Sequence, residues 1–255
     1  MMNAPPISRS RVGATLVEVL VVIGVIGVLF SIAFPALLNA RASGGQVKSL
    51  SQARDVALLL GQFAESNRET YLAVRPNTNY SQSFNPNSGG ASFTNDADAR
   101  WMSRHWWPNA LNGLGFIDLR DRWNEFTSPG ADVTAETYRF PSYMYSNSVV
   151  AAPQLWMDSF NGSTEALRDV RTSEVSFPSH KVIVWDGAVA YLPPGQIPEQ
   201  AVRPMAFVDG HASVHRIRDA TEPVLNQLNS AGWRGMKLHN TQAGVLGRDF
   251  GASEY

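Results

Sequence analysis

The sequence predicts an α+β protein in which a long N-terminal helix, membrane-spanning in its first half, packs on an antiparallel β-sheet. Three observations support this prediction: an unbroken apolar run near the N-terminus, a helical stripe of apolar residues after it, and two Asp-Gly pairs set between β-rich runs. With 255 residues the chain can bury a substantial core, and the absence of cysteines excludes disulfides and thiol chemistry. Charged residues make up only 17% and the net charge is −1, so no nucleic-acid partner is expected.

The apolar run covers residues 19–38, and Ser31 is its only polar side chain. Between residues 12 and 40 the only charged residue is Glu18. A helix of 20 residues is about the length needed to cross a hydrocarbon core of roughly 30 Å. We therefore expect a single transmembrane helix with the lipid bilayer as its partner. Arg9 and Arg11 precede this helix and favour a cytoplasmic N-terminus, which leaves residues from about 43 onward outside the cytoplasm.

Two sites of proteolytic processing are compatible with this segment. Ala40-Arg41-Ala42 has the small-residue spacing of a secretory signal cleavage site, although 20 apolar residues exceed the 7–15 that such signals use. The alternative is a cut before the apolar run, which leaves the helix on the mature chain.

The N-terminal segment resembles the processing motif of type IV prepilins and type II secretion pseudopilins. Residues 11–18, RVGATLVE, contain the end of a short basic leader, Gly13, a Thr-Leu pair and Glu18, and Pro35 follows at the spacing common in that family. The motif covers roughly the first 40 residues, and Ala14 stands where the family usually has Phe.

This resemblance implies that a prepilin peptidase cuts between Gly13 and Ala14 and methylates the new amine of Ala14. Glu18 would then pair with the N-terminal amine of a neighbouring subunit, and the alternative is that its carboxylate reaches the lipid headgroups. Pro35 would kink the helix because it removes a backbone hydrogen bond. The partners implied are the prepilin peptidase, other pilin or pseudopilin subunits, and an inner-membrane assembly platform.

The resemblance also implies the division of the chain: a leader at 1–13, a transmembrane helix at 14–40, its amphipathic continuation at 41–72 and a pilin-like α+β head at 73–255. The implied function is a structural subunit without enzymatic activity or cofactor, held in the bacterial inner membrane with a periplasmic head, or present in a filament at the cell surface. Two alternatives are a minor tip subunit that recognises a partner through loops around 75–130, and an enzyme that uses the helix only as a tether.

Residues 46–72 are predicted to continue the helix, because apolar residues recur there at three- and four-residue steps. These residues are Val47, Leu50, Ala53, Val56, Ala57, Leu60, Phe63 and Ala64. The spacing is typical of a helix face that packs against a core. Gly44-Gly45 adds a second flexible point after Pro35.

Three β-rich runs predict the strands of the sheet, at residues 138–145, 181–185 and 204–208. Asp186-Gly187 and Asp209-Gly210 each follow such a run and predict hairpin turns, one within residues 180–192 and one within 205–217.

The second hairpin contains the phrase FVDGH at residues 207–211. It resembles the C-terminal region of a prepilin-like family found in planctomycete- and verrucomicrobia-type bacteria, in which a His precedes an Asp-Gly pair by nine intervening residues. Glu199 and Ser176 stand where that His would precede the two Asp-Gly pairs, so no role of the His is transferred.

Residues 75–100 are rich in Asn, Ser, Pro and Gly and predict a loop. Asp96 and Asp98 in this loop are candidates for a calcium site, as some major pseudopilins bind calcium, but two carboxylates do not define one and no metal ligand is assigned. Trp101, Trp106 and Trp107 flank His105. These aromatic residues either cap the core, which we favour, or form a platform for a sugar or a protein partner.

Motifs of catalysis and metal binding do not stand out. His211 and His215 have the spacing of a helical metal pair, but on a strand they lie about 13 Å apart, too far to hold one ion. The chain has no phosphate-binding glycine loop, nucleophile elbow or zinc-protease helix, and the other histidines are isolated in sequence.

Overall fold

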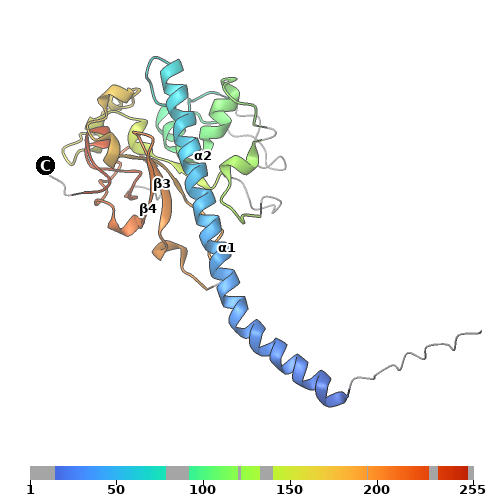
Figure 1. Cartoon of the computed structure of the whole chain (residues 1–255). Helices are drawn as coiled ribbons and strands as arrows, with labels where there is room; N and C mark the ends of the chain where they lie inside the picture. The colour runs from blue at the N-terminus through green and yellow to red at the C-terminus, as the bar shows by residue number, and fades with distance from the viewer. Residues whose placement is uncertain are drawn as a thin grey trace, which may run out of the picture. The chain divides into compact units, whose positions relative to one another are not determined.

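The computed structural model describes residues 15–78, 92–119, 122–132, 140–193, 195–229 and 235–251. The chain divides into two compact units, residues 1–41 and residues 42–255, and the second unit is called the head below. The helices are α1 (Leu16–Ser66) and α2 (Asp96–Gly113) (Figure 1). The strands are β1 (Tyr143–Tyr145), β2 (Val182–Asp186), β3 (Arg203–Phe207) and β4 (Ala212–His215), and short 3-10 helices connect them.

The four strands form one antiparallel sheet in the order β1-β2-β3-β4. The two central strands, β2 and β3, are buried along their whole length, whereas β4 is only half-buried. The hairpin predicted at residues 205–217 is confirmed, because Arg203 pairs with His215 and Ala206 with Ala212 across it. Gly210 lies in the turn with φ of 86°, a conformation that favours glycine. The α+β class is therefore confirmed.

The hairpin predicted at Asp186-Gly187 is wrong. The chain turns after β2 without forming a second strand, and β2 pairs instead with β1 and β3. The reason is local: the Asp186 carboxylate accepts hydrogen bonds from the backbone N–H groups of Ala188 and Val189, at 2.9 and 2.8 Å. Hydrogen bonds from the next residues to the aspartate side chain stabilise a tight turn, and these residues therefore do not continue into an extended return strand.

The part of α1 in the head packs one face against the core. Its buried apolar residues are Ala53, Val56, Ala57, Leu60, Phe63 and Ala64, as the periodicity predicts. They join one hydrophobic cluster with Ile183 and Val184 of β2. Val47, predicted on the same face, is 69% exposed. The face of α1 that packs on the head begins with Gly45 and Ser49, which are one helical turn apart. Val47 lies halfway between them in the sequence and therefore projects from the opposite side of the helix.

The helix ends at Ser66, six residues before the predicted end at Leu72. The side-chain amide of Asn67 donates to the carbonyl of Phe63 at 2.8 Å, and the next two residues, Arg68 and Glu69, have φ of 58° and 59°. Left-handed residues end a helix because they turn the chain away from the next helical hydrogen bond. The following segment then lies extended, and the amide of Tyr71 donates to the carbonyl of Val170.

Glycine allows a close approach between α1 and the loop after β2. A Cβ atom at Gly45 would overlap the Cβ of Tyr191, whereas one at the neighbouring Gly44 would meet nothing within 4 Å. The pair predicted as a flexible point therefore lies within a continuous helix, and Gly45 serves as a contact surface.

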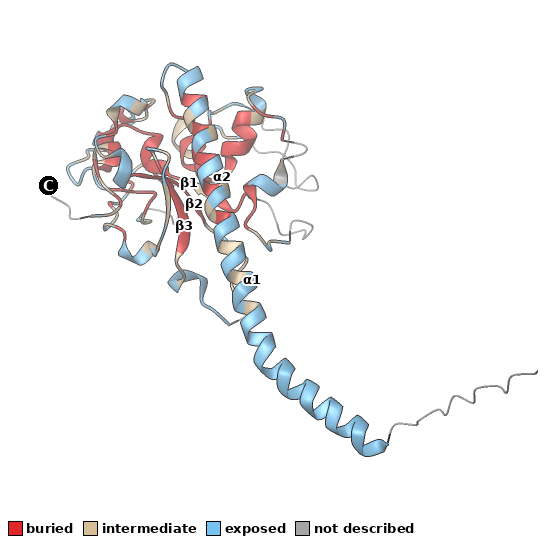
Figure 2. Ribbon diagram, viewed as in Figure 1, coloured by how far each residue is buried: buried red, intermediate tan, exposed pale blue. Residues whose placement is uncertain are grey.

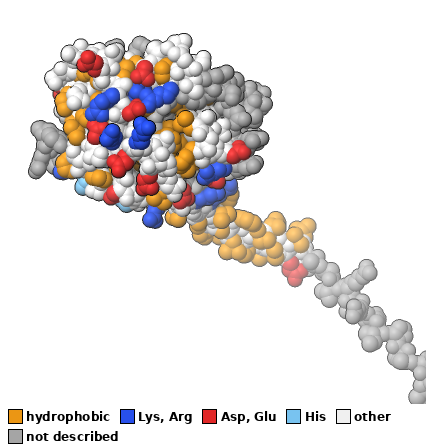
Figure 3. Space-filling model, turned by 90° about the horizontal axis from the view of Figure 1, so that it is seen from above, with side chains coloured by type: hydrophobic (Ala, Val, Ile, Leu, Met, Phe, Trp, Pro, Cys, Tyr) orange, Lys and Arg blue, Asp and Glu red, His pale blue; other side chains and the backbone are white. Residues whose placement is uncertain are grey.

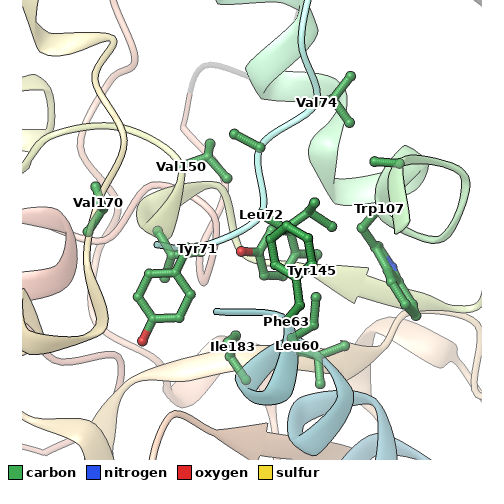
Figure 4. Close-up of a cluster of buried hydrophobic side chains, with 14 of the residues drawn as sticks. Leu60, Phe63, Tyr71, Leu72, Val74, Trp107, Tyr145, Val150, Val170 and Ile183 are labelled. Atoms are coloured by element: carbon green, nitrogen blue, oxygen red, sulfur yellow. The ribbon is translucent and has the colours of Figure 1, made fainter. Parts of the chain in front are cut away.

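The core lies between α1, α2 and the sheet (Figures 2 and 4). Its largest fully buried side chains include Trp107, Trp156, Tyr143 and Tyr145. Trp107 of α2 donates from Nε1 to the carbonyl of Tyr143 at 2.9 Å and so joins helix to sheet.

The predicted loop at 75–100 is corrected at its end, since α2 begins at Asp96 with Asn95 accepting the backbone N–H of Asp98 as an N-cap; residues 79–91 lie outside the described part. Residues 235–251 dock on the head: the amide of Val224 donates to the carbonyl of Asn240, and the amide of Asp249 to the carbonyl of His180.

Replacing Asp186 by Ala is expected to destabilise the head by about 3 kcal/mol or more. Asp186 is fully buried and accepts hydrogen bonds from Ser49 Oγ at 2.7 Å and Ser128 Oγ at 2.6 Å besides its two backbone donors. Removing the carboxylate leaves buried donors unsatisfied, at about 1–3 kcal/mol each. Urea unfolding of the full chain in detergent measures this. Asp209→Ala in the other, exposed Asp-Gly pair is the control and should cost less than about 1 kcal/mol. Equal losses at both sites would contradict the assignment.

Candidate functional site

The most distinctive surface of the molecule is the uncovered apolar helix of the first unit. Within α1 an 18-residue window has a mean hydropathy of 2.8, and none of it is buried (Figure 2). From Leu16 to Leu37 its large apolar side chains are exposed by between 45%, at Ile26, and 80%, at Leu16. Figure 3 shows hydrophobic side chains covering this part of the helix. This part of α1 is apolar on every side, and α1 is long and apolar enough to cross a membrane.

Thr15 and Glu18 form a capping box at the start of this helix. The Glu18 carboxylate accepts the backbone N–H of Thr15 at 2.7 Å and its hydroxyl at 2.9 Å, and Thr15 Oγ1 accepts the N–H of Glu18 at 3.3 Å. These bonds satisfy backbone donors that a helix start otherwise leaves free. Sequence reasoning singled out Glu18 but missed Thr15, although the Thr-x-x-Glu spacing is the signature of such a box.

Within the apolar helix the polar groups are satisfied locally. Ser31 donates its hydroxyl to the carbonyl of Val28 at 2.7 Å, one turn earlier. Pro35 lies inside α1, which continues without a break, so the predicted kink stays a prediction. Gly13 and Ala14, the predicted cleavage and methylation positions, lie outside the described residues.

The tryptophans of α2 belong to the core. Trp101, Trp106 and Trp107 are 3%, 7% and 0% exposed, which confirms that they cap the core and excludes an open aromatic platform. Trp101 packs edge-on against Trp156, with ring centroids 5.7 Å apart. His105 lies between them in the sequence, and its ring contacts Phe140 in a tilted arrangement, with centroids 4.6 Å apart.

The candidate metal-ligating residues make contacts with other protein groups. Asp96 accepts from Arg100 Nε at 2.9 Å, and Asp98 accepts the side-chain amide of Asn95. In the described part of the chain, no group of three His, Asp or Glu side chains is placed to hold a metal ion. Calcium binding therefore gains no support from the described residues.

His211 and His215 both pack against Phe207. The His211 ring stacks on Phe207 with centroids 4.2 Å apart, and the His215 ring meets Phe207 at 5.7 Å and stacks on Phe250 at 4.4 Å. The two histidines thus belong to an aromatic cluster with Phe207 and Phe250.

A second histidine pair lies inside the head near a buried arginine. His239 is 2% exposed, and its ring meets Trp185 with centroids 4.6 Å apart. Burial, together with the charges of Arg104 and His105, holds the pKa of His239 well below its usual value. Burial and Arg104 likewise lower the pKa of His105 to about 3. Both rings are therefore neutral at physiological pH.

Comparison of the chain with protein-family models, with curated proteins and with solved structures finds no match.

Because His239 and His105 have lowered pKa values, we expect the head to become less stable in acid. Unfolded histidine binds a proton near pH 6.5, whereas folded His239 resists protonation, so the free energy of unfolding falls as pH drops below about 6.5. One such group contributes up to about 1.4 kcal/mol per pH unit. Urea unfolding between pH 6.5 and 4.5 should give a shallower pH dependence for His239→Gln than for the unmodified chain, with pH 8 as the reference. Identical slopes would show that His239 does not titrate differently on unfolding.

Proposed function

We propose that this chain is a pilin-like subunit that is anchored by its N-terminal helix and assembled into a type IV pilus or a type II secretion pseudopilus. The observation that carries the proposal is the uncovered apolar helix with a single carboxylate, Glu18, fixed at its start. A helix of this kind needs an apolar surrounding, which either a bilayer or the packed helices of a filament would supply. The resemblance of residues 11–18 to the prepilin processing motif points to the same function.

Glu18 would act in assembly through its charge. An ionisable group near a membrane helix start is costly unless it has a partner, and in the unprocessed chain Thr15 supplies two hydrogen bonds. Cleavage between Gly13 and Ala14 would create a positive amine one residue before Thr15. The Glu18 carboxylate could then exchange its capping contacts for an ion pair with such an amine on a neighbouring subunit, which would set the axial register of a filament.

The head would be held outside the cytoplasm by the same helix. The residues of α1 from Ala42 onward belong to the head, and those from Ala53 onward contribute to its core, so the anchor and the head share one helix. The proposal requires no cofactor. Its partners would be the prepilin peptidase, neighbouring subunits and the assembly platform of the inner membrane.

Mass spectrometry of the mature N-terminus, from membrane fractions with and without prepilin peptidase, tests the processing step. The proposal predicts a chain that begins at methylated Ala14 only when the peptidase is present. A chain beginning at Ser43 would indicate ordinary secretion and would remove the apolar helix. An uncut chain in both fractions would indicate a simple membrane anchor and favour a tethered domain.

Three substitutions separate the charge of Glu18 from its capping role. Glu18→Ala removes both, while Glu18→Gln keeps a side-chain acceptor for Thr15 but removes the charge. If pairing with an amine drives assembly, both variants should insert into the membrane normally and lose at least 90% of their incorporation into sheared filaments. Ser31→Ala, which removes the only polar side chain of residues 19–38, is the matched control and should assemble normally. Normal assembly of Glu18→Gln would assign the residue to capping alone.

A further inference from the structure

The head has a surface cavity of about 610 Å³ beside the end of α1. The turn after the helix, the extended segment that follows it and the segment before the Thr70–Arg171 bridge all contribute to its walls. Figure 3 looks onto the head from the side at which α1 ends and shows Lys and Arg side chains gathered there. The cavity is distinct from the apolar helix of the first unit, since all of its lining residues belong to the head.

The charged residues that line the cavity are mostly cationic. They are four arginines, Arg68, Arg75, Arg168 and Arg171, and a single acid, Asp169. This excess of positive charge occurs in a chain whose net charge is −1. A concave wall with charges of one sign raises the local potential and attracts the opposite charge.

The acid in the cavity is already engaged. Asp169 Oδ2 pairs with Arg75, and its Oδ1 lies 3.2 Å from Nη1 of Arg100, whose side chain is 3% exposed. These contacts lower the pKa of Asp169 although burial opposes them, so the carboxylate stays ionised. Arg168 pairs with Glu174 at 2.6 Å. These pairs fix the geometry of the wall.

Arg68 and Arg171 differ from the other two arginines. Both are exposed, and neither forms an ion pair with any residue in the described part of the head. Arg171 pairs with Thr70 in an isolated β-bridge, and Arg68 is the first of the two left-handed residues that end α1. The charge of Arg171 also helps to lower the pKa of Glu174, whose carboxylate pairs with Arg168 and accepts the backbone N–H of Arg171 at 2.9 Å. Arg68 and Arg171 therefore present two exposed guanidinium groups at one cavity.

The same cavity has an apolar part. Phe63, Leu72 and Leu114 line it, and Leu114 is 64% exposed. A site for a bare inorganic anion or for a nucleic-acid backbone would gain nothing from this surface. A peptide that alternates carboxylates with apolar side chains could use both, since guanidinium groups bind carboxylates with two parallel hydrogen bonds while Leu114 covers an apolar side chain.

We propose that this arginine-lined cavity binds an acidic peptide segment of a partner protein, with Arg68 and Arg171 contacting its carboxylates and Leu114 contacting an apolar side chain. The site would let the head recognise a protein independently of assembly through the N-terminal helix. Binding should weaken with added salt, because exposed charge pairs are screened over about 10 Å at 0.1 M ionic strength.

The test uses the full, unprocessed chain in detergent micelles and a fluorescein-labelled hexapeptide, Leu-Glu-Leu-Glu-Leu-Glu, followed by fluorescence anisotropy. We expect saturable binding below 1 mM that weakens at least tenfold in the double variant Arg68→Ala/Arg171→Ala and about threefold or more in Leu114→Ser. The control, Arg54→Ala/Arg216→Ala, removes the same charge from exposed arginines that do not line the cavity and should bind normally. Thermal unfolding curves matching that of the unmodified chain confirm that the variants fold.

Three results would overturn this proposal: no binding up to 1 mM, equal weakening in both double variants, or tighter binding of a hexameric single-stranded oligonucleotide that depends on Arg68 and Arg171. The last result would assign the cavity to phosphates. Because neither cleavage nor filament formation enters the measurement, failure here leaves the assembly proposal intact, and failure of assembly leaves this site intact.

Discussion

The head depends on the buried carboxylate of Asp186. Burying a charge is costly unless several donors replace its water, and here two hydroxyls and two backbone amides do so. Ser49 of α1 donates to the Asp186 carboxylate, and the hydroxyl of Tyr143 in β1 donates in turn to Ser49 Oγ at 3.1 Å. Arg203 of β3 caps the carbonyls of Asp186 and Gly187, at 3.1 and 2.6 Å. The network around Asp186 thus joins α1 to β1, β2 and β3, and such a network is cooperative because each bond orients the next.

The opposite end of the same strand has a second buried acid. Lys181, immediately before β2, lies 3.4 Å from Asp249 Oδ2, and both side chains are at most 1% exposed. Asp249 also accepts the amide of Val182 at 2.7 Å and the hydroxyl of Thr241. Burial lowers the pKa of Lys181 and raises that of Asp249, while each partner's charge opposes the shift. The C-terminal segment therefore docks through a polar contact at the start of the central strand, and removing either partner alone would leave an uncompensated buried charge.

The sequence was sufficient to predict features set by local periodicity. The apolar run, the buried face from Ala53 to Ala64 and the hairpin at Asp209-Gly210 follow from residue spacing alone. Features set by distant partners could not be predicted in this way. Asp186-Gly187 has the composition of a hairpin turn. The carboxylate of Asp186 is buried because Ser49 on α1 and Ser128 donate hydrogen bonds to it, and both residues are far from it in the sequence. Helix α2 was missed because Asn, Asp, Trp and an internal Pro108 are weak helix signals, and its stability comes from packing. The arginine cavity joins residues about 100 positions apart, so no window of sequence contains it.

The close fit of Tyr191 against Gly45 has a mechanical consequence. Gly45 and Ser49 lie at the start of the part of α1 that belongs to the head, so tension applied along the helix from its N-terminus enters the head at these two residues. Side-chain contacts project sideways from a helix, and axial pulling loads them in shear, so that they share the force instead of breaking one after another. Because Gly45 lets Tyr191 pack directly on α1, the force reaches the hydrogen-bonded network around Asp186 at the first residues of the head.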